Sequence, residues 1–175
     1  MLKKNITQKS RVRRVLWNLV YLFLFRPTPN ILFGWRRFIL RSFGAKIGAR
    51  ARVYPNCLIW DPINLIMGHD SCIGLRANIY NVATVELGNY TVVSQDAYLC
   101  TATKSFWKDT RELLVAPIKV MDKAWVAADV FVCPGVTIGS ESAVLARCFV
   151  SVEVPPGHVM KMGASQIIEK LVLEI

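Results

Sequence analysis

The stretch that decides the fold is AWVAADVFVCPGVTIGSESAVLARCFV, residues 124–150, in which every sixth residue is aliphatic. The series starts just upstream and consists of Val120, Val126, Val132, Ile138, Val144 and Val150. An amphipathic helix repeats about every 3.6 residues and a half-buried strand every 2, so neither alone produces this period. Six residues are three strand periods, so each marked side chain points inward while its neighbours point out. The pattern predicts short strands that coil into a solenoid around stacked aliphatic side chains.

The same period recurs upstream and extends the predicted solenoid over most of the chain. It marks Ile47, Val53 and Ile59, then Met67, Ile73, Ile79 and Val85, and after a phase shift Leu87, Val93 and Leu99. Glycine often follows a marked residue, as at Gly48, Gly68 and Gly88, so we expect tight glycine or asparagine corners. With three hexads to each triangular turn, the period predicts an all-β parallel β-helix of about five turns, from roughly residue 47 to residue 153.

Two segments break the period, and loops that leave a rigid scaffold are common places for functional sites. Residues 60–66 make a short excursion. Residues 101–117, TATKSFWKDTRELLVAP, make a longer one between two regularly phased halves. The longer excursion is therefore the first place in which we expect functional residues.

The positive charge of the chain is concentrated at its N-terminus. Residues 1–50 hold 12 of the 22 lysines and arginines and no acidic residue, whereas residues 51–175 hold 10 basic and 12 acidic residues. With 53% hydrophobic and 19% charged residues, the chain is predicted to form one folded domain, and a disordered polyelectrolyte is excluded. The basic part carries no nucleic-acid readout motif, so nucleic acid is not an expected partner.

Residues 1–43 are predicted to form an arm of two basic amphipathic helices. The apolar run VLWNLVYLFLF, residues 15–25, is too short to span a bilayer, which takes about 20 apolar residues. The second helix has two opposed sets of side chains, Trp35, Phe38 and Ile39 against Arg36, Arg37 and Arg41. Such helices suit peripheral contact with an anionic membrane through residues 11–43. The alternative is that they pack on the protein's own body and leave their arginines in solvent.

The cysteines and histidines argue against the usual metal sites. The five cysteines are an odd number and no two form a C-x-x-C pair, so we expect neither a disulfide framework nor a zinc site, and a cytoplasmic location is favoured. The two histidines are too few for a three-histidine metal site in one chain. We therefore expect no metal cofactor.

Four motifs bring the chain close to a known family: FGAKIG at 43–48, SQDAYLCTAT at 94–103, AWVAADVFVCPGVTIG at 124–139 and VPPGHV at 154–159. Together with the hexads, they resemble the hexapeptide-repeat acyltransferases, in particular the colanic-acid-type exopolysaccharide acetyltransferases. The resemblance covers roughly residues 31–170 and implies a left-handed β-helix over residues 44–160. It also implies cytoplasmic homotrimers, with active sites between subunits, that transfer an acetyl group from acetyl-CoA to a sugar hydroxyl.

In this family a histidine general base takes the proton of the sugar hydroxyl as the oxygen attacks the thioester. At the matching position after the Cys-Thr motif this chain has Lys104, followed by Ser105, and neither His69 nor His158 matches it. Lys104 could act as the base, hold the acceptor or a coenzyme phosphate as a cation, or be an exposed loop residue. Two functions stay open: an O-acetyltransferase, or a catalytically impaired relative that is a structural or regulatory partner in polysaccharide assembly.

The resemblance also implies binding residues. For acetyl-CoA they are Trp125, Ala128, Ala146 and Ser151, where small side chains let the pantetheine chain approach the backbone. For the sugar acceptor they are Asn78 and Asn81, although asparagine at a corner is commonly just a turn former.

The C-terminal segment, residues 161–175, is predicted to form a short amphipathic helix. It groups four apolar side chains, those of Ile167, Ile168, Leu171 and Val172. Such a helix would cap the coil or pack on a neighbouring molecule.

Overall fold

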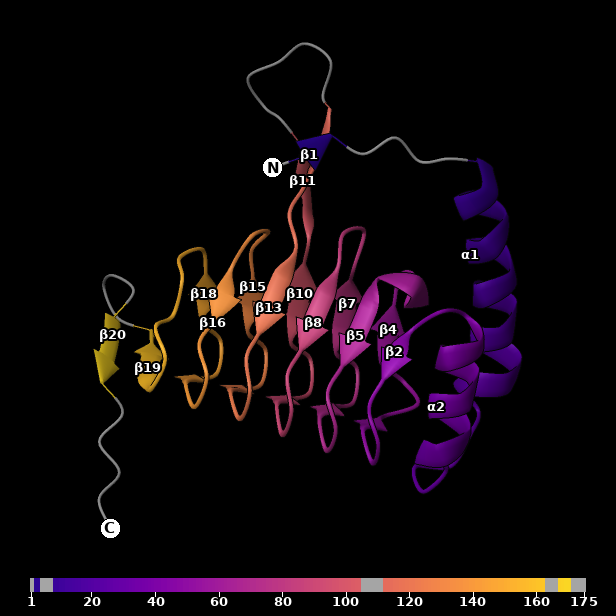
Figure 1. Cartoon of the computed structure of the whole chain (residues 1–175), viewed down its shortest axis with the longest axis horizontal. Coiled ribbons are helices and arrows are strands. Elements are labelled where there is room, and N and C mark those ends of the chain that lie inside the picture. The colour runs from indigo at the N-terminus through magenta and orange to yellow at the C-terminus, as the bar shows by residue number, and fades with distance from the viewer. Residues whose placement is uncertain (1, 4–7, 105–111, 163–166, 171–175) are drawn as a thin grey trace.

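The predicted solenoid is confirmed by a computed structural model of the chain, which describes residues 2–3, 8–104, 112–162 and 167–170. Short strands stack into three parallel sheets along the molecule (Figure 1). Sheet 1 contains β2 (Lys46–Ile47), β5 (Leu65–Met67), β8 (Val85–Leu87), β13 (Ile118–Val120) and β16 (Thr137–Ile138). Sheet 2 contains β3 (Arg52–Val53), β6 (Cys72–Ile73), β9 (Val92–Val93), β14 (Trp125–Val126), β17 (Ala143–Val144) and β19 (His158–Lys161). Sheet 3 contains β4 (Leu58–Ile59), β7 (Asn78–Tyr80), β10 (Tyr98–Cys100), β15 (Phe131–Val132) and β18 (Phe149–Val150).

The chain visits the sheets in the order 1, 2, 3 in every coil, and the aliphatic markers form the core. In sheet 3, Leu99 lies in register with Ile79 on one side and Val132 on the other, and all three side chains are fully buried. Each coil therefore places the same kind of side chain over the one below. Burying an aliphatic side chain of this size is worth about 1.5–3 kcal/mol, so these rows are the main source of stability.

The predicted glycines Gly48, Gly68 and Gly88 lie at corners between sheets 1 and 2, and glycine has a left-handed backbone at two further corners, Gly135 and Gly157. The other left-handed corner positions carry charged or aromatic residues, which the sequence did not predict. Between sheets 1 and 2 these residues are Arg50, Asp70, Tyr90, Lys123 and Glu141; between sheets 2 and 3 they are Arg76, Asp96, Asp129 and Arg147. Neighbours in a column form ion pairs, as Arg50 and Asp70 do at 2.6 Å. Hydrogen bonds from Arg50, and then from His69, lower the pKa of Asp70 to about 2. Such exposed pairs add little stability, so the core rather than the corners must hold these turns.

The two helices predicted for the N-terminal arm are present and cover the first coil (Figure 1). Helix α1 (Gln8–Val20) continues into a π-helical turn (Tyr21–Phe25), and α2 (Phe33–Ser42) follows after a short loop. Trp17 and Phe25 are buried against the solenoid, and the Trp17 ring packs against Phe43 with centroids 5.3 Å apart. The arm is thus part of the hydrophobic core.

The orientation of α2 differs from the expectation of solvated arginines. Arg36 is fully buried, and its guanidinium donates to the Val53 carbonyl and to groups of the loop at residues 28–30. Trp35 and Phe38, in contrast, are 42% and 60% exposed. The arginine face of α2 therefore points toward the solenoid and the aromatic side chains point away. Ile39 is buried as Arg36 is, so its predicted grouping with Trp35 and Phe38 is wrong.

The inward arginines satisfy the open end of the β-helix. In the second coil, carbonyls of Met67, Ser71, Ile73 and Ile79 accept N–H groups from the first coil. The equivalent first-coil carbonyls, 20 residues earlier, have no preceding coil, and each accepts a hydrogen bond from the arm instead. The donors are Arg41 to Ile47, Arg37 to Ala51, Arg36 to Val53 and Trp17 to Ile59. Unpaired buried carbonyls are costly and an open strand edge invites other chains, so this cap stabilises the fold and protects its end.

The long excursion is a β-hairpin rather than an irregular loop. Strand β11 (Ala102–Lys104) pairs antiparallel with β12 (Leu113–Val115), and β1 (Leu2–Lys3) adds to the other side of β12. The sheet stands off the solenoid (Figure 1). At its base, Val82, Ala102 and Val115 form a second buried cluster, against which Tyr80 packs.

The prediction of a C-terminal helix over residues 161–175 is wrong where the structure describes this segment. Strand β20 (Ile167–Lys170) pairs antiparallel with β19 and extends sheet 2. The open edge of β19 provides backbone hydrogen-bond partners for this segment that a helix would leave unused. Leu171 and Val172 lie outside the described residues.

Candidate active site

Lys104, at the position where the family has its histidine, ends strand β11 on the hairpin. It lies opposite Leu113 in the register and is exposed. The base of the hairpin is fixed by Thr101, which is buried and donates through its hydroxyl to the Tyr80 carbonyl at 2.8 Å. Ser105 lies outside the described residues. An exposed cation is thus carried on an arm that is firmly anchored in the solenoid.

Two of the residues expected to contact acetyl-CoA lie together in a groove at the corner between sheets 2 and 3. The groove has a volume of about 700 Å³, and its lining consists of Gln95, Asp96, Ala128, Asp129, Ala146 and Arg147. Ala128 and Ala146 occupy equivalent positions of successive coils, since Arg147 N–H donates to the Ala128 carbonyl at 3.0 Å. Their methyl groups leave the backbone of this edge open to an elongated ligand.

The charged groups of this groove are held in long or exposed contacts. Arg147 Nε is 3.6 Å from Asp129 Oδ2, and both side chains are largely exposed. Asp96 accepts two hydrogen bonds from Arg76, which lower the pKa of its carboxyl group. Arg147 is thus the one cation among the residues that line this groove, and it is held by a long, exposed contact.

Trp125 lies beside this groove, on the outward face of β14. Its indole Nε1 donates to the Ser94 hydroxyl at 2.9 Å, and 47% of the residue is exposed. The bond fixes the plane of the ring next to the edge that Ala128 and Ala146 form.

Ser151 lies on a different edge. It follows β18, before Val154 bridges to Ile138 of sheet 1, so it belongs to the corner between sheets 3 and 1. The hairpin with Lys104 leaves the solenoid at this same corner, after β10 and before β13. The residues inferred for one site are thus divided between two edges, separated by the width of sheet 3.

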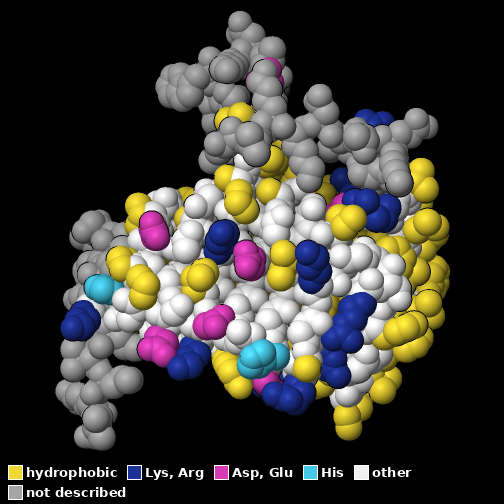
Figure 2. Space-filling view, viewed as in Figure 1, with side chains coloured by type: hydrophobic (Ala, Val, Ile, Leu, Met, Phe, Trp, Pro, Cys, Tyr) yellow, Lys and Arg dark blue, Asp and Glu magenta, His cyan; other side chains and the backbone are white. Residues whose placement is uncertain are grey.

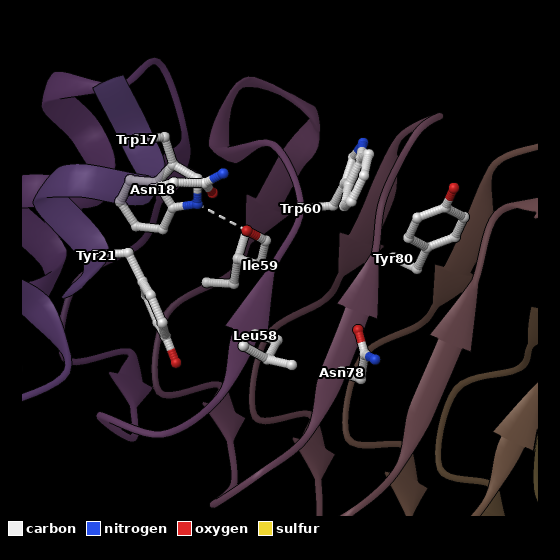
Figure 3. Close-up of a pocket in the computed structure, with 8 residues that line it drawn as sticks. All are labelled: Trp17, Asn18, Tyr21, Leu58, Ile59, Trp60, Asn78 and Tyr80. Carbon is white, nitrogen blue, oxygen red and sulfur yellow. Dashed lines mark hydrogen bonds between the residues drawn. The ribbon is translucent and has the colours of Figure 1, made fainter. Parts of the chain in front are cut away.

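Asn78 lines a second cavity, of about 320 Å³, between α1 and sheet 3 (Figure 3). The cavity is lined by Trp17, Asn18, Tyr21, Leu58, Ile59, Trp60, Asn78 and Tyr80. Trp60 and Tyr80 stand edge to face with centroids 4.9 Å apart, and the Arg14 guanidinium lies 4.6 Å above the Trp60 ring. Burial raises the pKa of the Tyr21 phenol, which keeps it a neutral hydrogen-bond donor. Flat aromatic faces next to amide and hydroxyl groups are what a sugar ring needs for binding.

Asn81 is placed differently from Asn78. It is fully buried, its amide oxygen accepts the Asp61 N–H at 3.0 Å, and its amide nitrogen donates to the Asp61 carbonyl at 2.8 Å. Its side chain therefore holds the excursion at residues 60–66 against the next coil and does not face the cavity.

The two histidines are engaged elsewhere. His69 lies at a corner, where Nδ1 is 3.0 Å from Asp70 and the ring packs on Tyr90. His158 Nδ1 is 2.8 Å from the Pro156 carbonyl at the start of β19. Neither lines the groove or the cavity.

The aromatic residues of the cavity were not predicted from the sequence. Trp60 and Tyr80 are spaced 20 residues apart, one full coil, and each follows an inward marker, Ile59 and Ile79. That spacing places both on the same outward row, and it was available in the sequence. The contribution of Trp17 and Tyr21 was not, because it depends on how α1 packs on sheet 3.

No protein-family model matches this sequence. Over 163 residues the chain is 36% identical to WcaF of Escherichia coli K12, assigned as a colanic acid biosynthesis acetyltransferase, which covers 93% of this chain and 90% of the relative. It is 23% identical to the galactoside O-acetyltransferase of E. coli K12, over 78% of this chain and 68% of the relative. Among solved structures, the hexapeptide-repeat acetyltransferase of Vibrio cholerae superposes with a TM-score of 0.85 at 20% identity, over 95% of this chain and 94% of that one. The fold is accordingly that of the left-handed β-helix acetyltransferases, and by its identity to WcaF the chain belongs to the family of colanic acid biosynthesis acetyltransferases.

Proposed function

We propose that this chain transfers an acetyl group from acetyl-CoA to a sugar hydroxyl in the synthesis of an exopolysaccharide or surface polysaccharide. The observation that carries the proposal is the groove in which Ala128 and Ala146 lie side by side. Family membership supports the reaction class, and a galactoside acetyltransferase solved with coenzyme A superposes with a TM-score of 0.85 over 97% of this chain, at 20% identity.

The groove favours a coenzyme through its small side chains and its arginine, and it opposes the coenzyme phosphates through two carboxylates. Small side chains on the groove edge suit pantetheine, and the exposed Arg147 offers a positive charge for a phosphate. The two carboxylates of Asp96 and Asp129 oppose an anion, so Arg147 must turn from Asp129 to the phosphate. The groove therefore predicts binding of moderate strength.

In the proposed reaction the sugar oxygen attacks the thioester carbonyl carbon and forms the ester bond. The carbon–sulfur bond breaks, the hydroxyl proton passes to a base, and a proton returns to the coenzyme thiolate. Lys104 is the candidate for the base on the hairpin, and its amine must be neutral to accept a proton. The acceptor is assigned to the cavity at Asn78, because Tyr80 of this cavity also packs on the base of the hairpin that carries Lys104.

We propose a homotrimer as the working form, and the division of these residues between two edges supports it. Lys104 and Ser151 are on the edge between sheets 3 and 1, whereas Ala128 and Ala146 are on the edge between sheets 2 and 3. A complete site needs the edge between sheets 3 and 1 of one subunit to lie against the edge between sheets 2 and 3 of its neighbour. Head-to-tail contacts of this kind close into a ring, and three subunits form the smallest such ring. The proposed location is the cytoplasm, with peripheral contact to a membrane through residues 11–43.

The first test is binding of acetyl-CoA to the purified chain by calorimetry, which needs no knowledge of the acceptor. We expect micromolar affinity with one site per chain. Ala146→Leu is expected to weaken binding about tenfold or more, because its larger side chain blocks the groove edge. Ala49→Leu is the matched control, since Ala49 also precedes a left-handed arginine at an exposed corner, but outside the groove. Absence of binding at millimolar acetyl-CoA would contradict the proposal and favour a structural partner in polysaccharide assembly.

The second test concerns the base. Lys104→His is expected to raise the release of coenzyme A in the presence of a panel of neutral sugars by about 100-fold, because a positioned imidazole contributes about 10²–10⁴ to such reactions. Lys119→His, on the exposed face of β13, is the control and should leave the rate unchanged. Rates would be compared at saturating acetyl-CoA. If the native chain is already fast and Lys104→His slows it, Lys104 is itself the general base. If neither protein releases coenzyme A although both bind acetyl-CoA, the assignment of a sugar acceptor fails.

A further inference from the structure

The helical arm is apolar on two opposite faces. One face of α1 and the π-turn, with Trp17, Tyr21 and Phe25, packs on the solenoid. On the other face, side chains at spacings of three and four residues are about half exposed or more: Val12, Val15, Leu16, Leu19, Leu22, Phe23 and Leu24. An apolar outer face on such a helix points to a second partner, because monomeric soluble proteins rarely expose a continuous apolar surface of this kind.

The adjoining loop and α2 extend this surface. Ile31 is 82% exposed, and Leu32, Trp35 and Phe38 are also exposed, because the arginines of α2 turn inward to cap the first coil. Figure 2 shows the result as a hydrophobic band along the edge of the molecule where α1 and α2 lie. We call these exposed side chains of α1, the π-turn, the loop and α2 the outer apolar face.

The chemistry of this face fits the interfacial layer of a bilayer. The Trp35 indole N–H donates to the Leu24 carbonyl at 2.9 Å, so the ring enters an apolar layer without an unpaired donor. Arg11 and Arg26 are exposed near the two ends of the α1 and π-helical segment. No acidic residue occurs before Asp61, and Asp61 is itself buried and paired with Arg13. A surface of phosphate groups therefore meets cations and no carboxylate.

The same charges disfavour a second copy of the chain as the occupant. A symmetric contact would set two segments against each other that each hold 12 basic and no acidic residues in their first 50 positions. Such like-charge contact is destabilising, whereas anionic lipid attracts each basic side chain. In the part of the chain that the structure describes, no helix has the length and apolar content to cross a bilayer.

We propose that the outer apolar face docks the protein in the plane of an anionic lipid surface, with the solenoid standing away from it. The apolar side chains enter the region between headgroups and acyl chains, and Arg11 and Arg26 contact lipid phosphates. The inference deepens the proposed function, on which it rests only for the conclusion that sugar acceptors are modified at a membrane. Docking itself depends on the arm alone.

The test is co-sedimentation of the full chain with phosphatidylcholine vesicles that contain either no anionic lipid or about one third phosphatidylglycerol. The native chain is expected to bind the anionic vesicles at least about tenfold more tightly than the neutral ones. The combined variant Leu16→Ser, Leu19→Ser and Phe23→Ser should weaken this binding about tenfold or more. A variant with Met121→Ser, Phe149→Ser and Val152→Ser loses as many exposed apolar side chains outside the arm and should bind like the native chain.

A second pair of variants tests the electrostatic contribution to vesicle binding. Replacing Arg11 and Arg26 by glutamine should reduce the preference for anionic vesicles, whereas Arg52→Gln, on the exposed side of β3, should not. Failure of the native chain to sediment with either vesicle overturns the proposal, whatever the variants do. So does a change of oligomeric state in the Leu16, Leu19 and Phe23 variant, measured by analytical ultracentrifugation, without a loss of vesicle binding.

Calorimetry with acetyl-CoA separates this inference from the proposed function. The variant at Leu16, Leu19 and Phe23 should keep the native affinity for acetyl-CoA, because the groove at Ala128 and Ala146 is remote in sequence and on another element. If no form binds acetyl-CoA but the native chain binds anionic vesicles, the proposed function fails and the docking surface stands. If acetyl-CoA binds and vesicles do not, the docking inference fails alone.

Discussion

Gly68→Ala is expected to destabilise the protein by about 3 kcal/mol, the upper end of the cost of forcing extra volume into a packed interior. A β-carbon at Gly68 would lie 2.6 Å from the Asn89 backbone nitrogen and 2.6 Å from the Gly88 carbonyl carbon, in the next coil. Backbone atoms cannot swing aside as the end of a long side chain can. The coils would have to separate locally, with loss of ladder hydrogen bonds on both sides of the corner.

The matched control for Gly68→Ala is Gly34→Ala. Gly34 lies on α2, where an added β-carbon meets only the end of the Arg37 side chain, at 3.8 Å. Alanine is the better helix former, so this variant should be as stable as the native chain or up to about 1 kcal/mol more stable. Both midpoints would be measured by urea denaturation at constant protein concentration. Equal stability of the two alanine variants would contradict the close packing of the corners.

Arg36→Met is expected to cost about 3 kcal/mol or more, because it leaves buried acceptors without partners. Its guanidinium donates to the Val53 carbonyl, to the Thr28 hydroxyl at 2.8 Å and to the carbonyls of Pro29 and Asn30. Methionine fills most of the volume but donates nothing. Arg36→Lys should recover only a small part of the loss, since one ammonium cannot reproduce the planar fork of donors.

The control for Arg36 is Arg52→Met, at an exposed position of β3 directly before Val53. It removes the same charge and should change the free energy of unfolding by no more than about 0.5 kcal/mol. The comparison, again by urea denaturation, separates the cap of the first coil from a general effect of net charge. A similar loss in both variants would mean that the capping bonds contribute nothing.

Much of the solenoid could be predicted because its cause is local and repeated. An inward aliphatic residue at every sixth position, as at Val126, Val132 and Ile138, predicts one regular structure, a parallel β-helix with short strands and tight corners. The conformation of the corners was harder. Gly68 was correctly expected at a tight corner, but the left-handed residue of that corner is Asp70, and the glycine is needed for the absence of its β-carbon. One residue type serves both purposes, so composition does not separate them.

The candidate site was predictable to the extent that it follows the repeat. Ala128 and Ala146 are equivalent corner residues of successive coils, and their meeting in one groove is a consequence of the period. Asn78 and Asn81 look alike in the sequence. Alternation along the strand points Asn78 toward the cavity, whereas the packing of the excursion at residues 60–66 buries Asn81. That difference comes from contacts between coils, which a single segment does not contain.

The sequence alone contains the periodicity, the excursion, the family motifs and the concentration of positive charge, because each is a property of residues close together in the chain. The use of that charge depends on tertiary structure. Whether Arg36 faces water or the solenoid is decided by the unpaired carbonyls of the first coil, which exist only once the coil has formed. Leaving these carbonyls buried without hydrogen-bond donors costs more free energy than removing an arginine side chain from water. Satisfying it turns Trp35 and Phe38 outward and creates the outer apolar face.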